Sequence, residues 1–154
     1  MSHVVGNTSE FASETSAAVR ALRAASAHVE HMLARALEAH ELTAAQFSVL
    51  EVMDEMTDDA IQCSELGRRL HGPGPDVTRL LDRLESGGLV ARDRDQKDRR
   101  VVHTRITELG RSVLQKARPD VRTAEEQALA DLPTEARRHL TSLLQDVQRR
   151  CPGS

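Results

Sequence analysis

The sequence of 154 residues has almost no aromatic side chains: two phenylalanines are present, and tryptophan and tyrosine are missing. Proteins that read single-stranded nucleic acid commonly stack its bases on aromatic side chains. Stacking of that kind is therefore not available to this chain.

Cysteine is also scarce, since Cys63 and Cys151 are the only two and no CxxC pair occurs. Two cysteines this far apart do not indicate a disulfide framework. We interpret Cys63 as a small, unreactive apolar residue. The alternative is a redox switch, which would need exposure and a neighbour that stabilises the thiolate.

Long apolar runs are absent as well. No stretch of about 18 apolar residues occurs, which excludes a membrane-spanning helix. The N-terminus lacks the apolar core of a signal peptide, so we expect a cytoplasmic protein. The length suits one domain with its own core. Because no nucleophile motif, phosphate-binding loop or paired-carboxylate arrangement is found, we expect neither an enzyme nor a bound cofactor.

The most informative stretch is residues 75–86, where an apolar stripe at spacings i, i+3, i+4 and i+7 predicts a helix. The stripe consists of Val77, Leu80, Leu81 and Leu84. The opposite face carries Asp76, Thr78, Arg79, Asp82 and Arg83. Pro75 suits the first helical position, and Gly87 suits the left-handed conformation that ends a helix.

Two short β-rich runs follow this helix, at residues 89–92 and 101–106, with a charged turn at 93–100 between them. A third short strand is expected at residues 60–62. Residues 64–70 indicate a short helix with Ser64 as its N-cap, and the glycines and prolines of 71–75 indicate a turn. Helix, turn, helix and hairpin together are typical of a winged helix-turn-helix fold.

Long helices are expected on both sides of this unit. Residues 1–14 are expected to form a flexible arm, and residues 15–39 a long amphipathic helix. Thr43 and Gln46 form a capping box at the start of a buried helix. Residues 108–150 are expected to be helical, with Thr107 as the N-terminal cap, a kink or interruption at Pro119 and a new helix start at residues 132–134.

The terminal helices expose apolar stripes that need a partner, and we expect a second subunit to cover them, with an intramolecular bundle as the alternative. The expected dimerisation residues are Leu22, Val29, Leu140, Leu143 and Val147.

Two histidines, His28 and His31, lie at i, i+3 on the first helix. We interpret them as exposed or half-buried polar positions. The alternative is a ligand or metal site that lines a cleft, with Glu30 or Glu41 close by. The residues expected at such an effector cleft are His28, His31, Met32, Arg35 and Met53.

Charge is unevenly distributed along the chain, whose net charge is −3. From Ser64 to Arg111 there are eleven Lys and Arg against eight Asp and Glu, a balance of +3, which leaves −6 for the remainder. Positive charge is therefore concentrated in the helix-turn-helix and wing, where a nucleic acid would bind.

In this order, several segments resemble the MarR (multiple antibiotic resistance regulator) family of transcription factors. The resemblance covers about residues 22–147. The segments are 42–47 (LTAAQF), 64–66 (SEL), 77–85 (VTRLLDRLE), 88–90 (GLV), 98–100 (DRR) and 105–110 (RITELG).

The resemblance implies a mainly α fold with a small β-hairpin wing, as one domain over residues 15–150. Its winged helix-turn-helix core spans about 43–107, between dimerisation helices at about 15–39 and 108–150. It implies a homodimer on a pseudo-palindromic operator in double-stranded DNA, and a cleft where small anionic or phenolic effectors bind in relatives.

The resemblance also assigns the DNA-facing residues. The recognition helix would use Pro75, Asp76, Thr78, Arg79 and Arg83. The wing would use Arg94, Lys97, Asp98, Arg99 and Arg100, with Asp98 orienting its arginine. The first helix of the motif contributes Ser64, Arg68 and Arg69. Asp76 departs from the Ser/Thr-rich start usual in relatives, and could accept a hydrogen bond from a cytosine amino group.

We therefore expect a homodimeric transcriptional repressor that a small-molecule effector releases from its operator. One alternative is a winged-helix protein-interaction module without operator binding. Another is a metal-sensing or redox-sensing member of the same family.

Overall fold

The computed structural model describes residues 7–56, 60–70, 77–94 and 101–150, with side chains from residue 13 onward. The elements in chain order are α1 (Asn7–Glu38), α2 (Ala44–Asp54), β1 (Ile61–Gln62), α3 (Cys63–Arg69), α4 (Val77–Ser86), β2 (Val90–Arg94), β3 (Val102–Ile106), α5 (Glu108–Ala128) and α6 (Thr134–Arg150). Within these residues, no helix combines the length and the apolar character needed to cross a bilayer.

The three strands form one small antiparallel sheet in the order β1-β3-β2. Strands β2 and β3 make the hairpin, with Val90 opposite Ile106 and Arg94 opposite Val102. The short β1 pairs with the outer edge of β3. The expected third strand is confirmed, and β2 continues to Arg94, two residues into the stretch that the sequence assigned to a charged turn.

A single core joins the sheet to the helices around it. Fully buried side chains come from α1, α2, α3, α4 and α5, namely Leu37, Val49, Leu50, Leu66, Leu81, Leu84 and Leu114. Burial of this apolar surface is the main force that fixes the helix-turn-helix against α2 and α5.

The start of α2 is fixed by the capping box that the sequence predicted. The Thr43 hydroxyl accepts a hydrogen bond from the Gln46 amide, and the Gln46 side chain accepts one from the Thr43 amide, at 3.2 and 2.9 Å. At the other end of α2, the carboxylate of Asp54 accepts hydrogen bonds from Arg111 and Arg118 of α5, both at 2.9 Å. These contacts hold α2 in place between the terminal helices and the helix-turn-helix.

Helix α5 begins against the base of the hairpin. The Thr107 hydroxyl accepts from the Gly110 amide at 3.0 Å and donates to the carbonyl of Gly88 at 2.7 Å. A Cβ atom at Gly110 would lie 2.1 Å from the carbonyl oxygen of Leu89, so only glycine permits this close approach. The predicted cap at Thr107 is confirmed, and it ties α5 to the wing.

The terminal helices differ from the sequence prediction in two ways. Helix α1 begins at Asn7, so residues 7–14 are helical and not a flexible arm. No glycine or proline occurs between Asn7 and Glu38, and polar residues can continue a helix. Helix α5 continues through Pro119 without the interruption expected there, and α6 begins at Thr134, within the new start predicted at residues 132–134.

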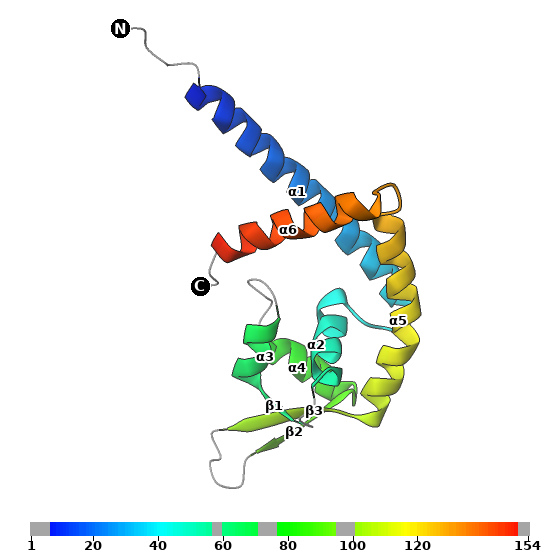
Figure 1. Ribbon diagram of the computed structural model, residues 1–154. Coiled ribbons are helices and arrows are strands. Elements are labelled where there is room, and N and C mark those ends of the chain that lie inside the picture. Colours follow the sequence, from blue (N-terminus) through cyan, green and yellow to red (C-terminus); the bar gives the residue numbers. More distant parts are fainter. Residues whose placement is uncertain (1–6, 57–59, 71–76, 95–100, 151–154) are drawn as a thin grey trace, which may run out of the picture.

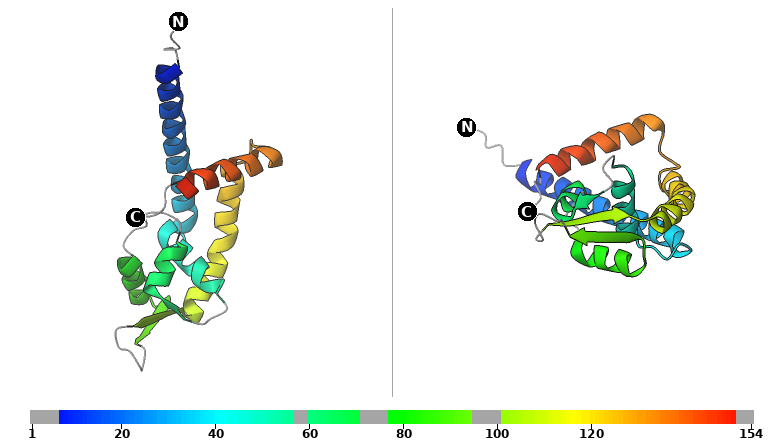
Figure 2. Two further views of the ribbon diagram at one scale, coloured as in Figure 1. Left: turned by 60° about the vertical axis from the view of Figure 1, so that its left-hand side comes forward. Right: turned by 90° about the horizontal axis from the view of Figure 1, so that it is seen from below.

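Much of the terminal helices is exposed in a single chain. Residues 13–28 of α1 are exposed all round, and the helix extends away from the rest of the molecule (Figure 2). Helix α6 lies at the same end of the molecule, opposite the wing (Figure 1), and buries none of its side chains.

Candidate nucleic-acid interface

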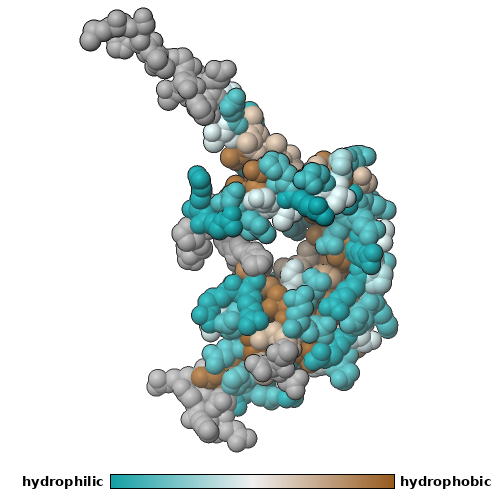
Figure 3. All heavy atoms as spheres, viewed as in Figure 1, coloured by the Kyte–Doolittle hydropathy of each residue, from teal (hydrophilic) through white to brown (hydrophobic). Residues whose placement is uncertain are grey.

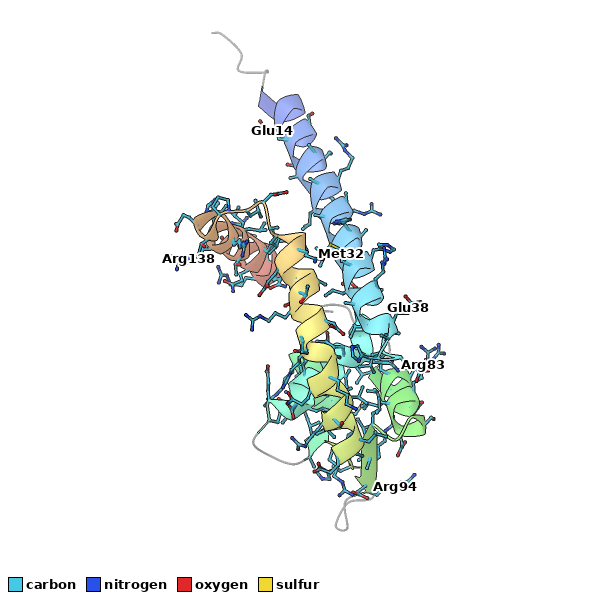
Figure 4. All side chains as sticks on the ribbon, turned by 90° about the vertical axis from the view of Figure 1, so that its right-hand side faces the viewer. Glu14, Met32, Glu38, Arg83, Arg94 and Arg138 are labelled. Atoms are coloured by element: carbon cyan, nitrogen blue, oxygen red, sulfur yellow. The ribbon has the colours of Figure 1, made fainter. Side chains whose placement is uncertain are left out.

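Helix α4 has one buried and one exposed face, as its sequence predicts. Leu80, Leu81 and Leu84 are buried in the core, and Val77 is half-buried. The opposite face exposes Thr78, Arg79 and Arg83. Figure 4 shows the Arg83 side chain directed away from the body of the molecule. The outward face of α4 therefore carries two exposed arginines and an exposed hydroxyl, while Pro75 and Asp76 lie outside the described residues.

The end of α4 is fixed by a left-handed glycine. The amide of Leu89 donates to the carbonyl of Leu84 at 2.9 Å, and that of Gly88 donates to Glu85 at 2.9 Å. This pair of bonds is a Schellman motif, and its left-handed residue is Gly88, with φ 70°. The prediction that Gly87 takes this role is wrong by one residue, because the Gly87 amide still donates to the Arg83 carbonyl as in the helix and the chain turns at Gly88.

The first helix of the motif, α3, carries the three residues expected there. Ser64, Arg68 and Arg69 are exposed on it. Ser64 is not the N-cap, since α3 already begins at Cys63 and its cap residue, Gln62, makes no side-chain bond.

Both α3 arginines are paired within their own helix. Arg69 donates to Glu65 at 2.9 Å, and Arg68 contacts the other oxygen of the same carboxylate. The hydrogen bond from Arg69 lowers the pKa of Glu65, with a further contribution from the Arg68 charge. A phosphate would have to compete with this carboxylate for either arginine.

A clamp between α4 and β2 holds the recognition helix in position. Arg92 of β2 donates to the Asp82 carboxylate at 2.7 Å and to the backbone carbonyl of Thr78 at 3.2 Å. Its Nε atom lies 3.7 Å from a carboxylate oxygen of Glu85. The sequence pattern predicts Asp82 on the polar, outward face of α4. Because Asp82 pairs with Arg92, its repulsion of a phosphate is reduced.

The hairpin carries exposed charge toward its tip. Arg94, the last residue of β2, is exposed and lies at the wing end of the molecule (Figure 4). Next to it, Arg105 of β3 pairs with Asp93 at 2.8 Å. The other wing residues expected from the sequence, Lys97, Asp98, Arg99 and Arg100, lie outside the described residues.

A cavity of about 1040 Å³ lies between the terminal helices and the helix-turn-helix. Figure 3 shows this face hollowed below α6, with hydrophobic residues in the recess. Its apolar lining includes Leu33, Leu37, Phe47, Val52, Leu80 and Val121. Its charged lining consists of Glu30, Glu51, Glu55, Glu125, Arg68 and Arg69.

The five residues expected at an effector cleft do not line this cavity. His28, His31 and Arg35 are exposed, Met32 is half-buried, and Met53 is buried in the core. The lining residues of α1 are instead Glu30, Leu33 and Leu37, which lie on the opposite face of the helix. The predicted cleft residues of α1 therefore lie on the face turned away from this cavity, and their role in binding an effector stays a prediction.

Across the described ranges, no group of three or more His, Cys, Asp or Glu side chains is placed to hold a metal ion. Cys63 is half-buried at the start of α3 and is a free thiol.

An exposed recognition helix, packed against a core and followed by a β-hairpin, defines a winged helix-turn-helix protein. Residues 32–117 match the family model described as transcriptional regulator SarA/Rot. The chain belongs to that family and, with its relatives and structural neighbours, to the MarR-type transcriptional regulators. These are transcription regulators and not enzymes.

Two named relatives illustrate the similarity. The regulator TtmR of Methylorubrum extorquens is 40% identical over 90 residues, which are 58% of this chain and 45% of that protein. The transcriptional repressor MprA of Escherichia coli is 27% identical over 114 residues, 74% of this chain and 65% of that protein. The chain spans about half the length of the first curated relatives it matches.

Solved structures match over more of the chain. A mutant of MarR from Escherichia coli, complexed with operator DNA, is 27% identical with a TM-score of 0.75, over 83% of this chain and 91% of that one. A MarR family regulator from Streptomyces coelicolor, in complex with DNA, has a TM-score of 0.83 over 92% and 90% of the two chains. At 22% identity, the second match shows the fold alone.

Proposed function

We propose that the protein is a homodimeric, sequence-specific regulator that binds double-stranded DNA and acts as a transcriptional repressor. The observation that carries this proposal is helix α4, whose leucines are buried while Thr78, Arg79 and Arg83 are exposed beside a hairpin. The Escherichia coli MarR mutant, which shares the fold at 27% identity, was crystallised with operator DNA.

In this proposal α4 enters the major groove, where arginine can form bidentate hydrogen bonds with guanine. Arg94 and the wing follow the adjacent backbone or minor groove, where negative potential is concentrated. Pro75, Asp76, Lys97, Asp98, Arg99 and Arg100 remain predictions from the sequence.

In the proposed dimer, the second subunit supplies the recognition helix for the second half-site. Large apolar side chains are exposed on both terminal helices: Val19 (50%), Leu22 (42%), Leu143 (49%) and Val147 (51%). Val29 and Leu140, also expected at the interface, are half-buried. A second subunit that covers this surface would hold two α4 helices about 34 Å apart, one turn of DNA, on a pseudo-palindromic operator.

The cavity between the terminal helices and α2, α3 and α4 is the proposed effector site. A ligand there contacts Leu80 of α4 and Leu33 of α1, so it can change the position of the recognition helix relative to the dimer. An effector with higher affinity for the released arrangement weakens operator binding. The factor by which it lowers the affinity for the operator equals the factor by which the operator lowers the affinity for the effector. A cytoplasmic location follows from this role, because the operator has to be accessible.

The direct test is selection of bound duplexes from a random DNA pool. We expect enrichment of a pseudo-palindrome whose half-sites are separated by about one helical turn. The selected duplex, attached to a fluorophore, then gives the affinity by anisotropy. No enrichment at low salt would contradict the proposal and favour the protein-interaction module instead.

A further inference from the structure

The cavity between α1, α2 and α5 has a lining that selects for ligand charge. Its apolar part comes from several elements at once, with Leu33 on α1, Phe47 on α2 and Val121 on α5. A volume of about 1040 Å³ is at the upper end of what small-molecule pockets enclose. A ligand that fills it therefore needs a large apolar body.

The charged part of the lining is predominantly acidic. Glu30 comes from α1, Glu51 and Glu55 from α2 and its C-cap, and Glu125 from α5. In the part of the chain that the structure describes, none of these four carboxylates forms an ion pair. The two arginines that also line the cavity are both paired with Glu65, which is not part of the lining. Glu65 balances only one of these two guanidinium charges, so the four carboxylates face a remaining charge of +1 and the lining is still negative overall.

The charged form of the Glu51 carboxyl is disfavoured mainly by burial and, to a smaller extent, by the neighbouring carboxylates. Its burial raises the pKa of its carboxyl, Arg118 opposes the rise, and the neighbouring charges of Glu125 and Glu55 add to it. Arg118 is itself engaged by Asp54 at 2.9 Å. A positive group placed among these carboxylates would relieve their repulsion, whereas an anion would increase it.

We propose that this cavity binds organic cations with a large apolar body. The inference rests on the effector role proposed above and adds the chemical class of the ligand. The apolar residues would contact the body of the ligand, and the four glutamates would surround its charge. This preference is opposite in charge to the anionic effectors that the family resemblance implies.

Two ions of nearly the same size and shape test the proposal, tetraphenylphosphonium (+1) and tetraphenylborate (−1). Titration calorimetry with the full chain at pH 7, without DNA, measures both affinities. We expect the cation to bind at least tenfold more tightly than the anion. No binding of the cation, or equal or tighter binding of the anion, would overturn the proposal.

Two charge-matched variants locate the binding. Glu51→Gln/Glu125→Gln removes two carboxylates from the lining and keeps its volume, so cation affinity should fall at least tenfold. Glu38→Gln/Glu126→Gln removes two exposed carboxylates from α1 and α5, which do not line the cavity, and should leave the affinity unchanged. Circular dichroism melting verifies that each variant is folded. Unchanged cation binding in the first variant would also overturn the assignment.

The selection from the random DNA pool, run beside the calorimetry, distinguishes failure of this inference from failure of the proposed function. A protein that binds the duplex but not the cation contradicts the cavity assignment alone. A protein that binds the cation through Glu51 and Glu125 but binds no duplex supports the cavity assignment and contradicts DNA binding.

Discussion

At the scale of single residues, Glu41 and Gly88 occupy equivalent positions at the ends of α1 and α4. Both have a left-handed backbone, with φ 55° and 70°, and both are followed by a residue whose amide bonds back into the helix. Glycine adopts this conformation without cost, whereas a residue with a Cβ atom is strained by about 1–2 kcal/mol. The end of α1 therefore stores strain that the end of α4 does not.

Opposite substitutions at these two positions should change stability in opposite directions. We expect Glu41→Gly to raise the free energy of unfolding by up to about 1 kcal/mol and Gly88→Ala to lower it by about 1–2 kcal/mol. Urea denaturation followed by circular dichroism measures both. If both variants were destabilised, the interpretation of Glu41 as a strained helix end would be incorrect.

Glu51 predicts a pH dependence whose sign follows from its raised pKa. The folded protein binds a proton at Glu51 more tightly than the unfolded chain does, so ionisation of Glu51 destabilises the fold as pH rises above about 4.5. Glu51→Gln should therefore raise the melting temperature at pH 7, and this gain should shrink toward pH 4. A gain that stayed constant with pH would contradict this account.

At the scale of elements, the clamp from β2 to α4 makes the recognition helix depend on the wing. We expect Arg92→Met to lower stability by about 1–2 kcal/mol, since it removes a charged hydrogen bond to a partly exposed partner. It should also weaken DNA binding by loosening α4. Chemical denaturation and anisotropy measure the two effects.

Arg105 offers a control for Arg92 on the same sheet. Its ion pair with Asp93 is exposed on both sides, at 54% and 62%, so Arg105→Met should cost only about 0–1 kcal/mol. Equal losses in the two variants would mean that Arg92 is an ordinary surface residue and not a clamp.

The elements that the sequence predicted well are those set by local rules. The apolar stripe of α4, the capping box at Thr43 and the cap at Thr107 each depend on residues a few positions apart, and the structure confirms all three. The Arg92–Asp82 contact joins residues ten positions apart on different elements, and no local sequence pattern predicts it. The cavity depends on how α1 is rotated against α2 and α5, which tertiary packing decides.

At the scale of the whole molecule, the exposed terminal helices need a partner. A helix that buries none of its side chains, such as α6, gains little stability within one chain. Its exposed residues Leu143 and Val147 lie one turn apart on the same face. This is the molecular basis of the proposed dimer, which the sequence could suggest only from unpartnered apolar stripes.

Charged substitutions on α6 test the dimer. Leu143→Glu/Val147→Glu should convert the protein to a monomer at micromolar concentration, because four carboxylates would be buried in each dimer. Sedimentation equilibrium measures the mass. Ser142→Glu/Gln145→Glu adds the same charge at exposed polar positions of α6 and should leave the dimer intact. A persistent dimer in the first variant would place the interface elsewhere.

Arg83, an exposed arginine on the outward face of α4, carries the proposed DNA contact most directly. The decisive measurement is the salt dependence of binding to the selected duplex, compared between the wild type, Arg83→Ala and the charge-matched control Arg122→Ala on α5. If Arg83 contacts a base, we predict a loss of about 1–3 kcal/mol in binding free energy. If it contacts a phosphate, the slope of log K against log salt should fall by about 1 for each arginine lost. An Arg83→Ala protein with the affinity and slope of the control would contradict the claim that α4 reads DNA.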